Sequence, residues 1–316
     1  MIDIRDGDYK VLTFSGGEQH VQLKAKLGAR AHEDGVLIHK RIQSSKDVMD
    51  LLLLVDILRG YRISKIALSM PYIPYARQDR RTEPTTSQSL KVFASLINSC
   101  NFEFVNVVDP HSMVAENLIN NMVAEPVSPY LRRFLLEIAG EDRVEGLDVV
   151  RTLDLNNIVL VSPDAGAIKK IESYAKELKI PNIVAFHKER DPATGDIKNI
   201  KCISGDKIWI KDKHVFVVDD ICDGGRTFIE MLKAYPAFLG VSATEKPKSL
   251  NLFVTHGIFS QGLRPLLAGG FTNIGSTNSF KSSKIGPDDD IDEDYKKLTI
   301  IPLNTYQERE NEKETT

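Results

Sequence analysis

Cysteine is scarce in this chain of 316 residues, and the three that occur, Cys100, Cys202 and Cys222, form no CxxC pair. This scarcity argues against a disulfide framework or a zinc ribbon and is typical of a reducing compartment. The longest apolar run, LLLLV at residues 51–55, is too short to span a membrane. The first residues, MIDIRDGD, contain early acids and no apolar core segment, so we expect no signal peptide. Together these absences predict a soluble cytoplasmic protein that does not contact a membrane.

Several catalytic signatures are also missing. The sequence contains no GxxxxGK(S/T) loop, no HExxH and no GxSxG, which argues against P-loop kinases, zincin-type proteases and hydrolases with a serine elbow. The net charge of −3 gives no electrostatic reason to expect nucleic acid as a partner. The hydrophobic content of 42% and the charged content of 27% are those of a globular protein, which at this length can hold two cores.

Apolar runs alternate with helical patterns along most of the chain. A β-rich stretch at 9–26, with a turn at 14–18, comes first, and Ser44 or Ser45 would cap the helix that follows. This alternation predicts an α/β protein with mainly parallel central sheets. The expected strands are 36–39, 63–70, 104–108, 157–161, 183–186, 215–218, 249–256, 271–278 and 298–302, and the expected helices are 45–59, 87–99, 130–138, 167–178 and 228–235.

The two halves of the chain echo each other, because VVDP at 107–110 and VVDD at 217–220 both end an apolar strand in acid. We therefore predict two tandem α/β domains of similar design, at residues 1–124 and 125–306, and a disordered tail at 307–316. The remaining segments are expected to be an irregular excursion at 140–155, a mobile loop at 191–201, strands near Ile203 and Trp209, and a solvated acidic loop at 288–294.

An apolar strand, two adjacent acids, a glycine pair, a cation and a hydroxyl follow one another in VFVVDDICDGGRT, residues 215–227. The carboxyl end of a buried parallel strand is where open α/β sheets bind ligands. Gly224 and Gly225 allow backbone N–H groups to surround an anion, and the helix behind them adds its positive end. Asp219 and Asp220 suit the vicinal hydroxyls of a sugar. The stretch predicts a ribose-phosphate cradle rather than an ordinary strand–turn–helix.

Other predicted strand ends carry complementary side chains. Asp109, His111 and Asp164 suit Mg²⁺ that is shared with water and phosphate oxygens. The cluster RQDRR at 77–81 would clamp a polyphosphate or a purine, and the cations of HKER at 187–190 would meet a transferring phosphoryl group when the expected mobile loop closes. Each group alone is more often a solvated surface residue, but together with the cradle they favour an active site.

Seven motifs occur in an order that is specific as a set and that spans nearly the whole chain: FSGGE at 14–18, YARQD at 75–79, VDPH at 108–111, VSPDAG at 161–166, HKER at 187–190, VVDDICDGGRT at 217–227 and THGIFS at 255–260. In these motifs the chain resembles the ribose-phosphate pyrophosphokinase (PRPP synthetase) family of nucleotide biosynthesis. The resemblance implies two phosphoribosyltransferase-like domains. It also implies Mg²⁺-dependent transfer of the β,γ-diphosphoryl group of ATP to the C1 hydroxyl of ribose 5-phosphate.

The resemblance assigns roles to individual residues as well. The residues for ATP binding would be Phe14, Gly16, Glu18, Arg77, Gln78 and Asp79. Of these, Phe14 and Glu18 would contact adenine from a neighbouring subunit of a homo-oligomer. Magnesium would be served by Asp109, His111 and Asp164, and the transferring group would be stabilised by the catalytic residues Lys188 and Arg190. The residues for ribose hydroxyls and the 5-phosphate would be Asp219, Asp220, Asp223, Gly224, Gly225, Arg226 and Thr227.

The chain also departs from the family pattern. The FSGGE turn comes almost at once, so one element that precedes it in the family is expected to be missing or replaced. Gly16 stands where an acid or amide is usual. Arg226 stands where a glycine is usual, next to the expected phosphate.

Alternative functions follow from these departures. A larger acceptor, such as the ribose 5-phosphate ester ADP-ribose, would give Arg226 a second phosphate to bind. The cradle alone is shared with phosphoribosyltransferases, although the Arg77 and Lys188 motifs favour diphosphoryl transfer. A non-catalytic subunit associated with a synthetase is the remaining alternative, and the presence of His111, Asp164 and Lys188 argues against it.

Overall fold

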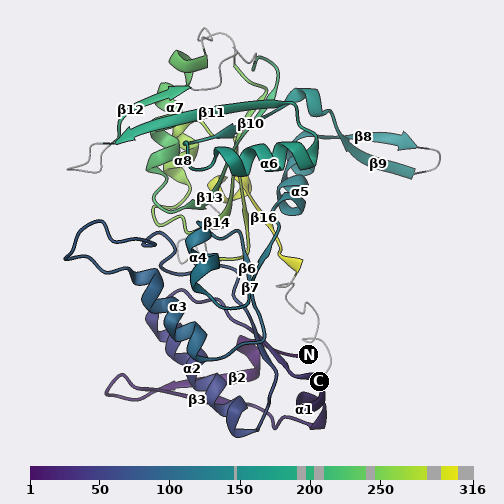
Figure 1. The fold of residues 1–316 in the computed structure, drawn as a ribbon. Helices are drawn as coiled ribbons and strands as arrows, with labels where there is room; N and C mark the ends of the chain where they lie inside the picture. Colours follow the sequence, from purple (N-terminus) through teal and green to yellow (C-terminus); the bar gives the residue numbers. More distant parts are fainter. Residues whose placement is uncertain (146–147, 191–196, 203–209, 240–245, 283–292, 305–316) are drawn as a thin grey trace. The chain divides into compact units, whose positions relative to one another are not determined.

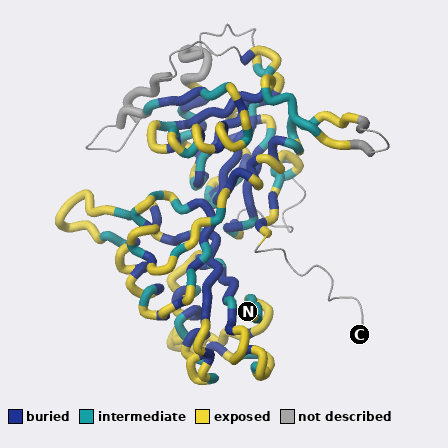
Figure 2. The backbone as a smooth tube through the Cα atoms, turned by 45° about the vertical axis from the view of Figure 1, so that its right-hand side comes forward, coloured by how far each residue is buried: buried dark blue, intermediate teal, exposed yellow. Residues whose placement is uncertain are grey.

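A computed structural model of the chain describes residues 1–145, 148–190, 197–202, 210–239, 246–282 and 293–304 (Figure 1). The chain divides into two compact units, Met1–Pro126, to which Asn304 also belongs, and Val127–Leu303. Figure 2 shows that the inner strands of both central sheets are mostly buried and that many outward turns of the helices are exposed. No helix among these residues is long and apolar enough to cross a membrane.

The first unit is built on five parallel strands in the order β1-β4-β5-β6-β7. They are β1 (Ile2–Ile4), β4 (Val36–His39), β5 (Ile66–Ser69), β6 (Val105–Val108) and β7 (Met122–Glu125). The helices of this unit are α1 (Ala29–Asp34), α2 (Ser45–Gly60), α3 (Ser89–Ser99) and α4 (Met113–Leu118). The parallel sheet confirms the predicted fold class, while β1, α1, α4 and β7 were not predicted.

Helix α2 begins where the sequence predicted. The Ser44 side chain accepts a hydrogen bond from the backbone N–H of Asp47, whose carboxylate accepts one from the Ser44 N–H in return. This reciprocal pair satisfies two amides that have no partner inside the helix. Leu51, Leu54 and Leu58 recur at helical spacing and are fully buried, so the helix packs one apolar face into the core.

A hairpin precedes α1, as the β-rich stretch predicted. Its strands, β2 (Tyr9–Thr13) and β3 (Gln19–Leu23), are antiparallel, and the turn between them uses Gly17 at φ +91°. β1 comes before the hairpin, and a single 3₁₀ turn, η1 (Asp6–Asp8), connects the two. Before the hairpin the chain therefore forms one short strand and one 3₁₀ turn.

The second unit holds a seven-stranded sheet in the order β12-β11-β10-β13-β14-β15-β16, in which only β12 is antiparallel to its neighbour among the described strands. The strands are β10 (Ile158–Ser162), β11 (Asn182–Arg190), β12 (Ile197–Cys202), β13 (His214–Cys222), β14 (Ser249–Gly257), β15 (Asn273–Thr277) and β16 (Leu298–Ile301). The helices are α5 (Ser128–Ala139), α6 (Ile168–Leu178), α7 (Arg226–Leu239) and α8 (Arg264–Gly269), with 3₁₀ turns at η2 (Leu155–Asn157) and η3 (Glu293–Lys297).

Two predictions about loops were wrong. Residues 140–155 are not irregular, because most of them form the antiparallel hairpin β8 (Gly140–Glu145) and β9 (Asp148–Leu153), which extends from the second unit in Figure 1. The expected mobile loop at 191–201 is partly strand, since β11 continues to Arg190 and β12 pairs back along it. In both places the hydrogen bonds between two paired strands stabilise regular structure, although the sequence is rich in charged residues. Residues 191–196, the strands expected near Ile203 and Trp209, most of the acidic run 288–294 and the tail 307–316 lie outside the described residues.

Helix α5 packs on the second sheet through an aromatic cluster that needs a glycine opposite it. The Phe134 ring lies 5.9 Å from that of Phe216 and 5.6 Å from that of Phe253, centroid to centroid. A Cβ on Gly275 would approach the Phe134 ring to 2.6 Å, well inside van der Waals contact. Because all three rings are fully buried, there is no room for the ring to move away.

We therefore expect Gly275→Ala to lower the free energy of unfolding of the second unit by about 1–3 kcal/mol, the usual cost of overpacking a core. Chemical denaturation would measure it. Gly269→Ala is the matched control, because its Cβ would meet Leu232 and Ile229 at ordinary contact distances of 3.5 and 3.7 Å. Equal denaturation midpoints for the two variants would contradict the packing argument.

Candidate functional site

Neighbouring strands of the second sheet bring most of its predicted site residues to one edge. Val161 of β10 pairs with Val184 of β11 on one side and with Val217 of β13 on the other. Because the strands are parallel, the residues that follow these pairs leave the sheet at the same edge. Asp164 follows Val161 on β10, Lys188 follows Val184 on β11 and Asp219 follows Val217 on β13, each within two to four residues.

The predicted cradle is a sharp turn between β13 and α7. Gly225 has φ +76°, a conformation that residues with a Cβ rarely adopt, and a Cβ there would lie 2.9 Å from Leu266. Its carbonyl accepts the first helical hydrogen bonds, from the N–H groups of Phe228 and Ile229 at 3.0 and 3.1 Å. The turn therefore sets the amino end of α7, with its positive dipole, directly behind the exposed Gly224.

The remaining cradle residues surround this turn. Arg226 is exposed and Thr227 half-buried in the first turn of α7, and Asp223 precedes the glycines. The carbonyl of Asp223 accepts a hydrogen bond from the Ser260 N–H at 3.2 Å, so the loop after β14 supports the cradle from the other side. Ser260 belongs to the THGIFS motif, which contained no predicted site residue.

Three carboxylates concentrate negative charge beside the cradle. Burial raises the pKa of Asp219 well above its ordinary value, and the charges of Asp220 and Asp164 raise it further. The N–H of Asp220 donates to Asp219 Oδ1 at 2.9 Å, which opposes that shift. Burial and the nearby Asp219 and Asp223 also raise the pKa of the Cys222 thiol, so this thiol stays protonated. Sugar hydroxyls or a divalent cation would relieve the excess negative charge.

Asp164 is held in place by its own loop. Its Oδ1 accepts the N–H groups of Gly166 and Ala167 at 3.0 and 3.1 Å, and its carbonyl accepts the Ser162 hydroxyl at 2.8 Å. These bonds fix the carboxylate at the amino end of α6, next to the cradle strand.

Lys188 and Arg190 lie on strand β11 rather than in the loop that was predicted. Lys188 pairs with Ile200 and Arg190 with Ile197 of β12, with an irregularity between Glu189 and Arg190. Their side chains lie outside the described part of the structure. The strand does place both residues beyond the end of β10, on the edge that carries Asp164.

Two loops of the first unit are joined by Asp79. Its Oδ2 accepts the hydroxyl of Ser112 at 2.9 Å, its carbonyl accepts the Gln88 side chain at 2.7 Å, and Arg80 lies 3.8 Å from its Oδ1. Arg77 and Gln78, the other predicted ATP contacts, are exposed immediately before it.

The loop that follows β6 carries the first unit's two predicted metal ligands. Asp109 is buried with φ 47°, whereas His111 is exposed. The contact between Ser112 and Asp79 thus connects this loop to the loop at 77–81. Asp164 belongs to the other unit, and among the described residues no three His, Cys, Asp or Glu side chains form a ready cluster for a metal ion.

The tip of the β2–β3 hairpin carries the remaining predicted ATP contacts. The N–H of Phe14 donates to the carbonyl of Glu18 and that of Gly17 to the carbonyl of Phe14, both at 2.8 Å. The Phe14 ring is 56% exposed, although its centroid lies 6.5 Å from that of His20. Gly16 is exposed beside Glu18. The turn therefore presents an unburied aromatic face and a carboxylate.

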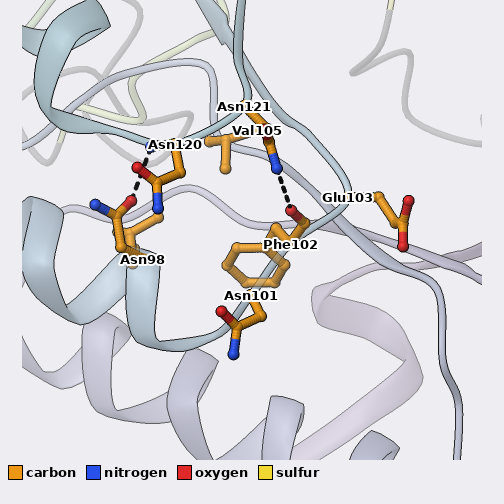
Figure 3. A pocket seen from close by; sticks show the side chains of 8 residues that line it. Asn98, Asn101, Phe102, Glu103, Val105, Asn120 and Asn121 are labelled. Carbon is orange, nitrogen blue, oxygen red and sulfur yellow. Dashed lines mark hydrogen bonds between the residues drawn. The ribbon is translucent and has the colours of Figure 1, made fainter.

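A polar cavity of about 270 Å³ lies elsewhere in the first unit (Figure 3). Val105, the first residue of β6, lines it, whereas Asp109 follows the last residue of the same strand, so the cavity is at the opposite edge of the sheet. Asn98 donates to the Leu118 carbonyl and accepts the Asn120 N–H, at 2.8 and 2.9 Å. Because these amide groups bind loop backbone, the cavity is structural and does not belong to the candidate site.

Known proteins resemble this chain along most of its length. Residues 1–100 match the N-terminal domain of ribose phosphate pyrophosphokinase and residues 146–237 match the phosphoribosyl transferase domain. The ribose-phosphate pyrophosphokinase of Agrobacterium fabrum is 26% identical over 260 residues, which are 81% of this chain and 74% of that protein. The Aquifex aeolicus protein of the same name is 28% identical over 264 residues, with coverage of 82% and 74%.

A solved structure shares the fold. The crystal structure of phosphoribosylpyrophosphate synthetase from Mycobacterium smegmatis superposes with a TM-score of 0.67 at 18% identity, covering 93% of this chain and 85% of that chain. The two parallel sheets, the cradle and these matches define a protein of two phosphoribosyltransferase-type domains. Within that class, the chain belongs to the ribose-phosphate pyrophosphokinase family.

Gly225→Ala should distort the cradle, because alanine disfavours φ +76° and its Cβ would press on Leu266. We expect KM for the ribose phosphate to rise at least about tenfold, since a displacement of only 1 Å can cost far more than that. Steady-state kinetics would measure it. Gly269→Ala on the adjoining helix α8 is the control, and a cradle variant with unchanged KM would contradict this geometry.

Asp219→Asn should stabilise the protein while it damages the site. Because folding raises the pKa of Asp219, its ionisation costs stability at high pH, and this cost disappears below the ordinary pKa of 3.8. The melting temperature of the variant should therefore be higher than that of the wild type at pH 8, and the difference should shrink towards pH 4. Each kcal/mol of added stability should raise the melting temperature by about 2–4 °C.

Calorimetry across this pH range would measure the difference, and Asp212→Asn, at an exposed turn, is the matched control. A difference in melting temperature that does not change with pH would contradict the electrostatic cause.

Proposed function

We propose that this protein transfers the β,γ-diphosphoryl group of ATP to the C1 hydroxyl of ribose 5-phosphate, giving PRPP and AMP. The observation that carries the proposal is the cradle at 219–227 beside Asp164, on adjacent parallel strands of a family member whose relatives are named ribose-phosphate pyrophosphokinase. The amino end of α7 and the glycine turn would hold the 5-phosphate. Asp219 and Asp220 would accept hydrogen bonds from the ribose hydroxyls.

The chemical step needs positioning and charge neutralisation more than a covalent nucleophile. The C1 oxygen forms a bond to the β-phosphorus of ATP and loses its proton. The bond from that phosphorus to the oxygen bridging the α- and β-phosphates breaks, and AMP leaves with that oxygen and its electron pair. Lys188 and Arg190 would stabilise the charge that develops on the transferring group.

The ATP would be held by residues of the first unit. Arg77 and Gln78 are exposed and would contact the nucleotide, while Asp79 would align their loop through Ser112. The exposed turn at 14–18 would provide the adenine contact of a neighbouring subunit, with a ring face from Phe14 and a carboxylate from Glu18. The functional form would then be a homo-oligomer.

Magnesium would neutralise the triphosphate when bound. Oxygen ligands and partial hydration suit this cation, and the charges of Asp164 and Asp220, which raise the pKa of the buried Asp219, support a cation-binding role for this group of carboxylates. Asp164, Asp109 and His111 would hold it together with phosphate oxygens. Because both substrates are charged phosphate esters that do not cross membranes, we expect the protein to act in the cytoplasm.

A larger acceptor is a second candidate. Arg226 is exposed in the first turn of α7, immediately after the glycine pair of the cradle, where it would meet an additional phosphate of an ester such as ADP-ribose. The reaction at C1 would be the same.

Incubation with Mg-ATP and a panel of ribose phosphates, followed by mass spectrometry, would distinguish these acceptors. We expect AMP and PRPP from ribose 5-phosphate. AMP release only with ADP-ribose would favour the larger acceptor, and its absence with every acceptor would exclude diphosphoryl transfer.

Lys188→Ala should lower kcat by about 10²–10³, the cost of removing one group that stabilises transition-state charge. KM for both substrates should change much less. The control is Lys176→Ala, an exposed lysine of α6, which should turn over like the wild type. Unchanged turnover in Lys188→Ala would contradict the role given to this strand.

A further inference from the structure

Lys40 is a buried cation at the carboxyl end of β4, in the first unit. Its side chain is 6% exposed, and its Nζ lies 2.8 Å from the Tyr9 hydroxyl and 3.2 Å from Asp6 Oδ1. Asp50 Oδ2 is 3.8 Å away and Asp47 Oδ1 is 4.0 Å away. Ligands of open α/β sheets bind at this edge, but the Lys40 ammonium contacts groups of its own chain.

These contacts connect four separate pieces of the fold. Asp6 lies in η1, Tyr9 begins strand β2, Lys40 follows β4, and Asp47 and Asp50 lie in the first half of α2. The Tyr9 hydroxyl also donates to Asp6 Oδ1 at 2.7 Å, so the lysine, the phenol and the carboxylate form a closed triangle.

The charges of the group are interdependent. Burial raises the pKa of Asp50, and the positive charge of Lys40 opposes that shift. Burial and the adjacent Asp6 raise the pKa of Tyr9, so it remains a neutral phenol that donates a hydrogen bond. The Asp50 side chain is only 9% exposed. Removing Lys40 would take away the cation beside this carboxylate, which is costly in a low-dielectric site.

The group reaches the hairpin tip through Gln19. The Gln19 side chain donates to Asp50 Oδ1, and Gln19 directly follows Glu18. Its strand partner is Thr13, the residue before Phe14. The bond from Gln19 to Asp50 therefore connects the hairpin to α2 at the last strand pair before the turn.

We propose that Lys40, Asp50 and Gln19 are positioning residues that set the hairpin tip, and through it the selection of the nucleotide base. This inference rests on the proposed function, in which Phe14 and Glu18 meet adenine. If the hairpin were not held, each binding of adenine would have to order it, and the lost entropy would lower the affinity. A hairpin that is fixed to α2 is ordered before the nucleotide binds.

Gln19→Leu tests the connection with little risk to folding, because it removes one hydrogen bond at a partly exposed site. We expect KM for ATP to rise about five- to tenfold, or roughly 1–1.4 kcal/mol, with kcat and KM for ribose 5-phosphate nearly unchanged. Discrimination between ATP and GTP should fall by a similar factor. Gln22→Leu, the same change at an exposed position of the same strand, should leave both quantities unchanged.

Hydrogen–deuterium exchange of the amides at 9–23 separates this inference from the proposed function, since it needs no substrate. Gln19→Leu and Lys40→Met should both speed exchange at the tip, and Lys40→Arg, which keeps the charge, should restore much of the protection. If Gln19→Leu matches Gln22→Leu in exchange and in ATP selectivity, the positioning network is excluded. If exchange changes but the wild type makes no AMP, the anchoring stands and the nucleotide role fails together with the proposed function.

Discussion

The parallel pairing of β11, β10, β13 and β14 is the constraint on which the second unit depends. It fixes which residues leave the sheet together, because every parallel strand delivers its following loop to the same edge. The predicted cradle, the Asp164 loop and the strand of Lys188 and Arg190 are separated by tens of residues in the chain and by single strand spacings in the sheet. Phe134 and the bare Gly275 keep α5 close enough to hold that sheet.

The same edge concentrates like charge, and the fold tolerates the cost. Asp219 lies within the field of Asp220 and Asp164, and burial adds to its raised pKa. A structure selected for stability alone would not place three carboxylates there. Perturbed carboxylates of this kind cluster at functional sites, and the proposed cation and ribose hydroxyls would supply positive charge and hydrogen-bond donors to them.

In the first unit a comparable arrangement of charge is already complete. Lys40 occupies the corresponding edge of its sheet, but the carboxylates of η1 and α2 neutralise it. Charge here connects elements instead of awaiting a ligand, and the hairpin with its exposed aromatic tip is the element that gains a fixed orientation. The two units thus use the carboxyl edge of a parallel sheet in different ways.

The sequence by itself determined the α/β class, the start of helix α2, the hairpin turn and the glycine turn between β13 and α7, because each depends on neighbours within a few residues, whereas the structure chose Ser44 over Ser45 as the cap. It did not reveal the strand character of Lys188 and Arg190, the β8–β9 hairpin or the Lys40 group. The two strand pairs are local hairpins whose charged sequences do not show the alternation typical of strands, so only the pairing of β8 with β9 and of β11 with β12 reveals them. The Lys40 group depends on distant residues, because Lys40 meets carboxylates from two other elements. Strand propensity depends strongly on the neighbours that a strand packs against. These features could therefore be recognised only from the tertiary structure.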